Sequence, residues 1–168
     1  MALSQPPHEQ YVFGDKAVAN YAQNPQQPLY NASTYQLRRI VSGNITDARD
    51  LAAIWQSSWD QQNLYLRVAV RDDVFKRDSQ YGWEDDSIEV FIDADASKRQ
   101  QYDHVNDYHL IYRWRDKRLM LGVNSQPIGV AHSTQHLNGN YVLDLTIPWA
   151  VMHAATQRSP HGYRHSCQ

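Results

Sequence analysis

Four segments of this chain alternate side chains with a period of two. They are NLYLRVAV (63–70), SIEVFID (87–93), YHLIYRW (108–114) and YVLDLTI (141–147). Because successive side chains of a β-strand point to opposite faces of a sheet, each segment is predicted to be a strand with one buried face. The buried sets are predicted to be Leu64, Leu66, Val68 and Val70; Ile88, Val90 and Ile92; Tyr108, Leu110, Tyr112 and Trp114; and Tyr141, Leu143, Leu145 and Ile147.

Turn residues separate these segments, and no helical periodicity alternates with them. Short strands joined by connections rich in Asp, Asn, Gly and Ser are typical of antiparallel sandwiches. The sequence therefore predicts an all-β fold, an antiparallel β-sandwich of the jelly-roll or immunoglobulin-like kind. One short helix is expected in WAVMHAA after Pro148, since proline suits the first turn of a helix.

The beginning of the chain differs from the remainder in composition. Residues 1–30 contain four prolines and many Gln and Asn, without a sustained apolar period. Residues 1–42 are therefore predicted to form an extended, partly irregular arm that includes the first strand or strands. Residues 43–168 are expected to form the sandwich itself, and the total of 168 residues suits one domain.

Charge and composition exclude several classes of partner. Sixteen basic and eighteen acidic residues are scattered along the chain, which leaves no basic patch for nucleic acid. No apolar run reaches the length of a membrane span, and MALSQPPHEQ lacks the pattern of a signal peptide. A single cysteine, Cys167, provides neither an internal disulfide nor a cysteine-based zinc site.

The stretch GWEDDSIEVFIDAD (82–95) concentrates acidic residues around one predicted strand. Glycoside hydrolysis needs two carboxyl groups about 5 to 9.5 Å apart across the scissile bond. Asp85 and Asp86 are neighbours that point in different directions, and the sequence supplies no partner for Glu89. No HExxH spacing or nucleophile elbow is present either. The sequence does not predict an enzyme.

Acidic residues that follow this strand are candidates for a calcium site. Asp93 and Asp95 leave the strand at alternate positions, and Asp103 and Asp107 follow a loop later. Hard oxygen ligands gathered in loops are what calcium requires. The EF-hand pattern does not fit, because Lys98 stands where that loop needs glycine. The alternative is that these carboxylates accept hydrogen bonds from backbone N–H groups in ordinary turns.

An aromatic pair at the entrance of the strand is a candidate for sugar binding. Trp83 follows Gly82 and lies two residues after Tyr81. An exposed indole face can stack on the apolar face of a pyranose ring. Glu89, on the polar side of the strand, could accept hydrogen bonds from sugar hydroxyls, although the pattern alone favours an ordinary surface glutamate.

Four segments taken together resemble, in order and spacing, the family 9 carbohydrate-binding modules. They are DLAAIWQSSWDQQNLYLRVAVRDD, GWEDDSIEVFIDAD, NDYHLIYRW and YVLDLTIPWAVM, within a likeness that runs from about Gly43 to Tyr163. The most specific element is the run W-x-x-D-S-[IV]-E-[VI]-F-I-D. Members of the family are β-sandwich modules often attached to xylanases and other secreted polysaccharide-active proteins.

The resemblance implies a function and assigns roles to residues. It implies non-catalytic binding of a plant-type polysaccharide or its oligosaccharides, an extracellular or periplasmic location, and a catalytic domain in a larger parent protein. Trp83 corresponds to one side of an aromatic clamp, and Glu89 to the residue that bonds sugar hydroxyls. Calcium in the family is structural, which makes Asp93, Asp95, Asp103 and Asp107 its expected ligands without fixing which of them bind.

Two departures from the family pattern bear on function. Ile111 stands where sugar-binding members carry an arginine, and Arg113, two residues on and on the same face, is the candidate substitute. The family continues past the IPW segment with further strands and the second clamp tryptophan, whereas this chain ends in SPHGYRHSCQ. The sandwich is therefore expected to lack the C-terminal strands of the family, unless the arm or a second chain takes their place.

These departures keep other functions open. The first alternative is an interaction or sensory domain of the same fold that has lost sugar binding. A second comes from sandwich relatives that bind haem through histidine and methionine, for which His109, Met120 and Met152 are the available ligands.

Overall fold

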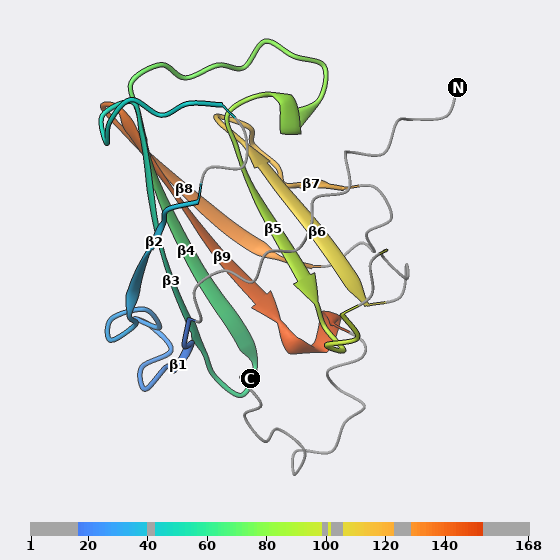
Figure 1. Ribbon diagram of the computed structural model, residues 1–168. Coiled ribbons are helices and arrows are strands. Elements are labelled where there is room, and N and C mark those ends of the chain that lie inside the picture. Colours follow the sequence, from blue (N-terminus) through green and yellow to red (C-terminus); the bar gives the residue numbers. More distant parts are fainter. Residues whose placement is uncertain (1–16, 40–42, 99–100, 102–105, 123–128, 153–168) are drawn as a thin grey trace.

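Two β-sheets pack face to face in the computed structural model, which describes residues 17–39, 43–98, 101, 106–122 and 129–152 (Figure 1). The larger sheet has the strand order β1-β3-β4-β9-β8, with β2 also paired to β3, and the smaller sheet has the order β5-β6-β7. The strands of the larger sheet are β1 (Asn20–Tyr21), β2 (Thr34–Leu37), β3 (Leu51–Trp59), β4 (Asn63–Asp72), β8 (Ala131–Leu137) and β9 (Asn140–Pro148). Those of the smaller sheet are β5 (Ser87–Asp93), β6 (Asp107–Arg113) and β7 (Met120–Leu121).

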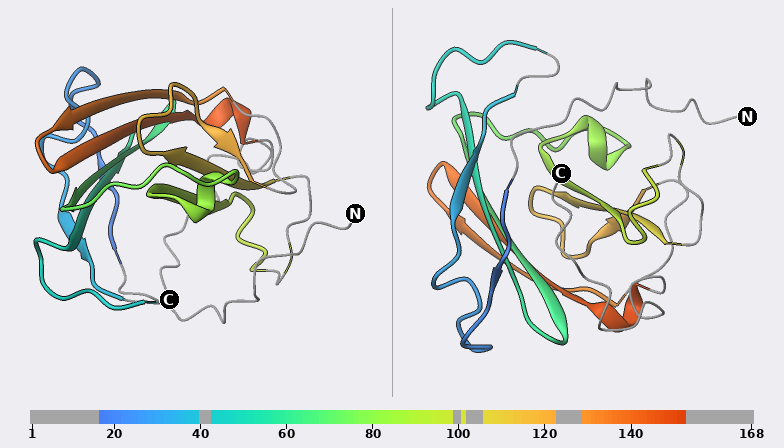
Figure 2. Two further views of the ribbon diagram at one scale, coloured as in Figure 1. Left: turned by 90° about the horizontal axis from the view of Figure 1, so that it is seen from above. Right: turned by 60° about the horizontal axis from the view of Figure 1, so that its bottom comes forward.

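The all-β sandwich prediction is confirmed. Figure 2 shows the two sheets as separate layers from two further directions. Within the described residues every strand pair is antiparallel except β1 with β3. Two 3-10 turns, η1 (Gly82–Glu84) and η2 (Trp149–Val151), are the helical elements of the described chain.

The core lies between the sheets and is built from the four predicted apolar faces. Its buried residues come from β4, β5, β6 and β9, and include Val68, Val70, Ile88, Tyr108, Leu110, Tyr112, Tyr141, Leu143, Leu145 and Ile147. Three of them are tyrosines, and a buried hydroxyl needs a hydrogen-bond partner. The Tyr108 hydroxyl donates to the carbonyl of Val151 at 3.1 Å, and the Tyr112 hydroxyl lies 3.2 Å from Nε2 of His136.

The start of the described chain extends the larger sheet. Residues Asn20–Tyr21 pair in parallel with the end of β3, and Thr34–Leu37 pair with its middle. The indole of Trp59 packs edge-on against Tyr21 at 5.1 Å between ring centroids, and its Nε1 donates to the carbonyl of Ala19 at 3.1 Å. Trp59 is thus a packing residue. The sandwich was expected to lack the family's C-terminal strands. This expectation falls on residues 153–168, which lie outside the described chain.

The helix expected after Pro148 is a single 3-10 turn in the described residues. Pro148 is the last residue of β9, and Met152 leaves the helical conformation with φ −95° and ψ 79°. The physical reason is that Met152 is drawn into the core, where it is 1% exposed. Trp149 also ties the turn to β3 and β4, because its Nε1 donates to the carbonyl of Asp60 at 2.8 Å. No helix in the described chain is long and apolar enough to cross a membrane.

Candidate functional site

The connection between β4 and β5 carries η1 onto the outer face of the smaller sheet. A Cβ built on Gly82 would overlap the end of the Met120 side chain and would lie 3.6 Å from Cγ2 of Ile111. The backbone of η1 therefore rests directly on β6 and β7, and glycine is what permits this approach. Ile111 is covered as a result and is only 1% exposed.

This contact places Trp83 at the surface with support from Tyr81. The two rings stack at 4.9 Å between centroids with an interplanar angle of 18°. Trp83 nevertheless keeps 45% of its surface exposed. The sequence-predicted aromatic pair is thus a real structural unit: one ring backs the other, and the indole remains accessible.

A buried carboxylate holds the loop that carries Trp83. The side chain of Asp85 has no exposed surface and accepts hydrogen bonds from the N–H groups of Asp78 and Ser79, at 3.0 and 2.9 Å. Arg113 adds an ion pair at 3.2 Å. Burial acts to raise the pKa of the Asp85 carboxyl, but these donors outweigh it and hold the pKa below its usual value.

Arg113, predicted to bind sugar, has its guanidinium directed at protein groups. Its Nε donates to Asp116 at 3.0 Å, and its Nη1 contacts both Asp85 and the carbonyl of Ser79. Asp116 also pairs with Arg77 at 2.6 Å. Arg113 therefore joins the β6–β7 turn to the loop before β5. Its role in ligand binding stays a prediction, and anchoring the loop is the role its contacts describe.

Glu89 lies on the outer face of β5, as the alternation predicts, and has a partner that the sequence did not reveal. Its Oε2 is 2.6 Å from Nε2 of His109. The His109 ring stacks on Phe91 at 4.1 Å between centroids, and a Cβ built on Gly122 would overlap it. The imidazole is thus held between β5 and the end of β7. The strand register, which a single sequence does not provide, is what brings Glu89 and His109 together.

The candidate haem ligands are not brought together. Met152 is buried in the core between the sheets, whereas Met120 lies beneath Gly82 on the outer face of the smaller sheet. His109 is engaged with Glu89. The smaller sheet therefore separates Met152 from the other two.

Two of the predicted calcium ligands, Asp93 and Asp107, lie opposite each other at the end of β5. Asp93 is paired in register with Asp107, and like charges directly opposite each other on a sheet are destabilising unless they are compensated. Asp93 accepts hydrogen bonds from the N–H groups of Ser97 and Lys98, at 3.1 and 2.7 Å. Asp103 lies outside the described residues. Within those that are described, no three His, Cys, Asp or Glu side chains are grouped closely enough to hold a metal ion.

Asp95 is a carboxylate whose ionised form is favoured by this turn. Its Oδ1 accepts the N–H of Ser97 at 2.9 Å. Burial acts to raise the pKa of Asp95, but hydrogen bonds with Asp93, Ser97 and Asn106 outweigh it, so the pKa lies below its usual value. An ionised carboxylate of this kind can act as a hard oxygen ligand for a metal ion. It can equally stabilise an ordinary turn by accepting backbone hydrogen bonds.

Trp83 does not line either of two surface depressions of the described chain, which have volumes of about 410 and 540 Å³. The smaller lies between β8 and the β6–β7 turn, and the other lies at the end of the larger sheet around the β8–β9 turn. The candidate site of Trp83, Tyr81 and Glu89 is an open platform, because Trp83 is 45% exposed and the Glu89 side chain is 29% exposed.

The architecture defines the class as a β-sandwich domain that displays an aromatic platform and a carboxylate on the outer face of its smaller sheet. A family model described as "Carbohydrate family 9 binding domain-like" matches residues 27–165, and the chain belongs to this family.

Curated relatives match only part of this chain. Endo-1,4-beta-xylanase A of Thermotoga neapolitana is 28% identical over 94 residues, which are 56% of this chain and 9% of that protein. Endo-1,4-beta-xylanase A of Thermoanaerobacterium saccharolyticum is 26% identical over 106 residues, 62% of this chain and 9% of that protein. This chain thus spans less than a tenth of the length of these relatives.

Two solved structures share the fold. One is a family 9 carbohydrate binding module from Caldicellulosiruptor kristjanssonii in complex with cellotriose, with a TM-score of 0.62 and 18% identity over 81% of this chain and 64% of that one. The other is a family 9 module from the same organism in complex with glucose, with a TM-score of 0.64 and 17% identity over 79% of this chain and 69% of that one. At this level of identity the similarity establishes the fold.

Proposed function

We propose that this protein binds carbohydrate on the platform formed by Trp83 and Tyr81, without cleaving it. The observation that carries the proposal is the indole of Trp83, 45% exposed and backed by Tyr81 at 4.9 Å. A large aromatic ring left accessible on a rigid support is the arrangement that stacking on a sugar requires. Membership of the carbohydrate-binding family supports the same function.

Glu89 supplies the polar half of the proposed site. Its side chain is 29% exposed, and His109 holds one carboxylate oxygen at 2.6 Å. The second oxygen can then accept hydrogen bonds from two neighbouring sugar hydroxyls, in an orientation that the imidazole fixes in advance. Tyr81 and Trp83 would contact the apolar face of the ring.

The ligand class we propose is a plant-type polysaccharide or its oligosaccharides, such as β-linked glucose or xylose units. The related family 9 modules are described in complex with cellotriose and with glucose, and the curated relatives are xylanases. An open platform without a surrounding pocket suits one or two residues of a chain better than an enclosed small molecule.

Absence of catalysis is part of the proposal and rests on the carboxylates near the platform. Glu89 faces His109 and not a second carboxyl group, and Asp85 is buried against Arg113. Two accessible carboxyls across a bond, which glycoside hydrolysis needs, are not provided by this pair. Chromatography of cellotriose and xylobiose after incubation with the protein should show intact sugars; the appearance of shorter products would overturn this part.

The matched relatives are about ten times longer than their matched region, so we propose that the domain works beside a catalytic domain of a larger protein. Because plant polysaccharides lie outside the cell, we propose that the protein is extracellular or periplasmic. Immunoblots of medium, periplasm and cytoplasm should find it outside the cytoplasm. Confinement to the cytoplasm would reject that location.

A structural calcium ion is proposed at the end of β5, with Asp93, Asp95 and Asp107 as candidate ligands together with Asp103, since the described carboxylates alone are not grouped closely enough to hold it. The support is the cross-strand pairing of Asp93 with Asp107 and the lowered pKa of Asp95. The ion would neutralise like charges that the register sets side by side. Calcium should raise the melting temperature of protein treated with a chelator, and the Asp93→Asn, Asp95→Asn double variant should lose that response. A melting temperature indifferent to calcium would reject the site.

One observation favours a second candidate function, an interaction or sensory domain that has lost sugar binding. Ile111 is buried beneath η1, and Arg113 is occupied by Asp85 and Asp116. The platform thus has no free arginine on β6 to bond a sugar hydroxyl.

Calorimetric titration distinguishes the two functions. The protein, with calcium present, is titrated with cellotriose, xylobiose and glucose, beside the Trp83→Ala and Tyr30→Ala variants. Tyr30 is also exposed, at 80%, but lies outside the platform, so its variant should bind like the wild type. We expect saturable heat that only Trp83→Ala abolishes. Absence of heat from every sugar, with a folded protein, would favour the interaction domain.

A further inference from the structure

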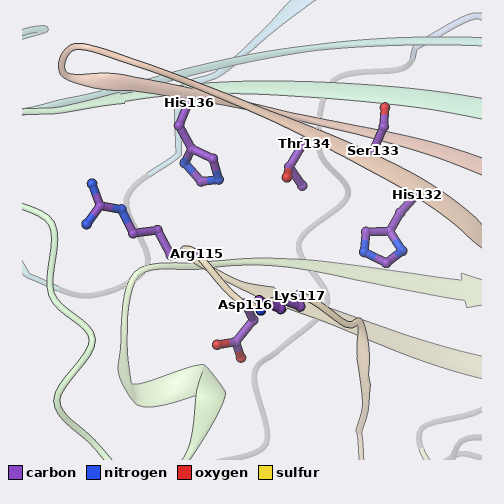
Figure 3. A pocket seen from close by; sticks show the side chains of 7 residues that line it. All are labelled: Arg115, Asp116, Lys117, His132, Ser133, Thr134 and His136. Carbon is purple, nitrogen blue, oxygen red and sulfur yellow. The ribbon is translucent and has the colours of Figure 1, made fainter.

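A polar groove separates β8 from the turn that follows β6, on a side of the sandwich that the proposed sugar platform does not use. It encloses about 410 Å³ (Figure 3). The groove is lined by His132, Thr134 and His136 from β8, and by Arg115, Asp116 and Lys117 from the turn.

The register explains why polar side chains line this groove. His132, Thr134 and His136 are paired with Leu145, Leu143 and Tyr141 of β9. Directly opposed residues of an antiparallel pair share a face, so the three polar side chains lie on the core side of the larger sheet. Figure 3 shows them pointing toward the turn, with Ser133 directed the other way. A sheet edge that faces the core with polar groups keeps the groove open to water.

The groove carries positive charge that the described protein does not neutralise. Arg115 lies over the ring of Trp114, with 4.3 Å from its Cζ to the ring centroid, and makes no ion pair with any described carboxylate. Lys117 has no such partner in the described chain either. The one acidic residue of the lining, Asp116, already accepts hydrogen bonds from Arg77 and Arg113. Two exposed cations beside a concave surface attract an anion.

The other lining groups suit a hydroxylated ligand. Thr134 offers a hydroxyl that can donate and accept, and His132 offers ring nitrogens. His136 has one ring nitrogen engaged by the Tyr112 hydroxyl at 3.2 Å, which orients the imidazole and leaves the other nitrogen for a ligand. His136 also stacks on the buried ring of Tyr141, at 6.3 Å between centroids, which further orients the imidazole.

We propose that this groove is a second ligand site, for a sugar acid. Its carboxylate pairs with Arg115 and Lys117, and its hydroxyls bond Thr134 and the imidazoles of His132 and His136. Only the sugar class of the ligand rests on the proposed function. Because the groove and the Trp83 platform share no residue, the two sites can be tested separately.

The test is an NMR titration of the isotope-labelled protein at constant ionic strength with glucuronate, glucose and inorganic phosphate. We expect glucuronate to shift the amide signals of residues 115–117 and 132–136 saturably, and glucose to leave them unchanged. Arg115→Met and Lys117→Met should each weaken the affinity about tenfold or more, the loss expected for a charge-assisted hydrogen bond. Arg118→Met, which removes a charge from the same turn outside the groove, is the matched control and should bind normally.

Three outcomes would overturn the proposal. The first is the absence of saturable shifts with glucuronate, and the second is an equal loss of affinity in Arg118→Met. The third is phosphate that reproduces the same shifts with equal affinity, since the groove would then hold an adventitious ion only. Trp83→Ala should leave the glucuronate response unchanged, so failure of the sugar platform cannot be mistaken for failure of the groove.

Discussion

At the scale of single residues, the platform depends on two glycines that let other side chains occupy the outer face of the smaller sheet. Gly82 admits Met120, and Gly122 admits His109. The two positions differ in which side chain would have to move if the glycine were replaced by a larger residue. The end of Met120 is flexible, whereas the His109 ring is held by Glu89 on one side and stacked on Phe91.

Gly122→Ala should therefore destabilise the fold by about 1–3 kcal/mol, the usual range for overpacking. Gly82→Ala should cost less, and Gly129→Ala, whose new Cβ would meet only Cγ1 of Val151 at 3.9 Å, should be the mildest. Urea unfolding of the three variants measures the order. A Gly122→Ala variant as stable as Gly129→Ala would show that His109 moves freely.

Asp85 should make the stability of the protein depend on pH in the acid range. The pKa of its carboxyl is lowered in the folded state, so its stabilising contribution is complete above the unfolded pKa of about 3.9. That contribution is lost as the pH falls through this value toward the folded pKa. Melting temperatures recorded from pH 7 to pH 3 should fall more steeply in the wild type than in Asp85→Asn. Parallel curves for the two proteins would contradict the lowered pKa.

At the scale of elements, the loop from β4 to β5 is held by side-chain contacts, ion pairs among them, rather than by strand pairing. Arg113 reaches both Asp85 and Asp116 and is 18% exposed, whereas Arg77 reaches Asp116 alone and is 44% exposed. Exposed pairs contribute little to stability, and buried carboxylates left without a partner cost much more.

Arg113→Met should therefore raise amide hydrogen exchange throughout residues 77–86, and Arg77→Met should change it little. The same pair of variants separates anchoring from ligand contact at the sugar platform. If Arg113→Met abolished sugar binding while the exchange of the loop stayed as in the wild type, a direct contact with the sugar would be indicated instead.

At the scale of the whole molecule, the two sheets share one core. Leu143 of β9 and Leu110 of β6 belong to different sheets and are 1% and 2% exposed. Either leucine changed to alanine should cost about 2–5 kcal/mol, through lost burial and the cavity left behind. Far-ultraviolet circular dichroism and tryptophan fluorescence should report a single transition in both variants. Separate transitions for the two probes would mean that the sheets unfold independently.

Sequence periodicity was sufficient to predict the four strands β4, β5, β6 and β9 and the face of each strand that packs into the core. The alternation that places Leu143, Leu145 and Ile147 on one side is a local property of the chain, and an apolar face must be buried wherever the strand pairs. The same reasoning did not define β3, β7 or β8, and AHSTQHL of β8 has no apolar face to detect. It expected a first strand or strands within residues 1–42, where β1 and β2 lie, without giving their bounds. Their pairing is decided by neighbours distant in sequence.

In the candidate site, too, some features could be predicted from the sequence and others could not. The sequence alone determined the strand that carries Glu89, the position of Trp83 beside Tyr81, and the family to which the chain belongs. Only the tertiary structure decided that His109 meets Glu89, that Arg113 is occupied by Asp85 and Asp116, and that β8 faces Arg115 and Lys117 across a groove. The physical reason is that periodicity specifies which way a side chain points, whereas its partner depends on register and packing between segments far apart in the chain.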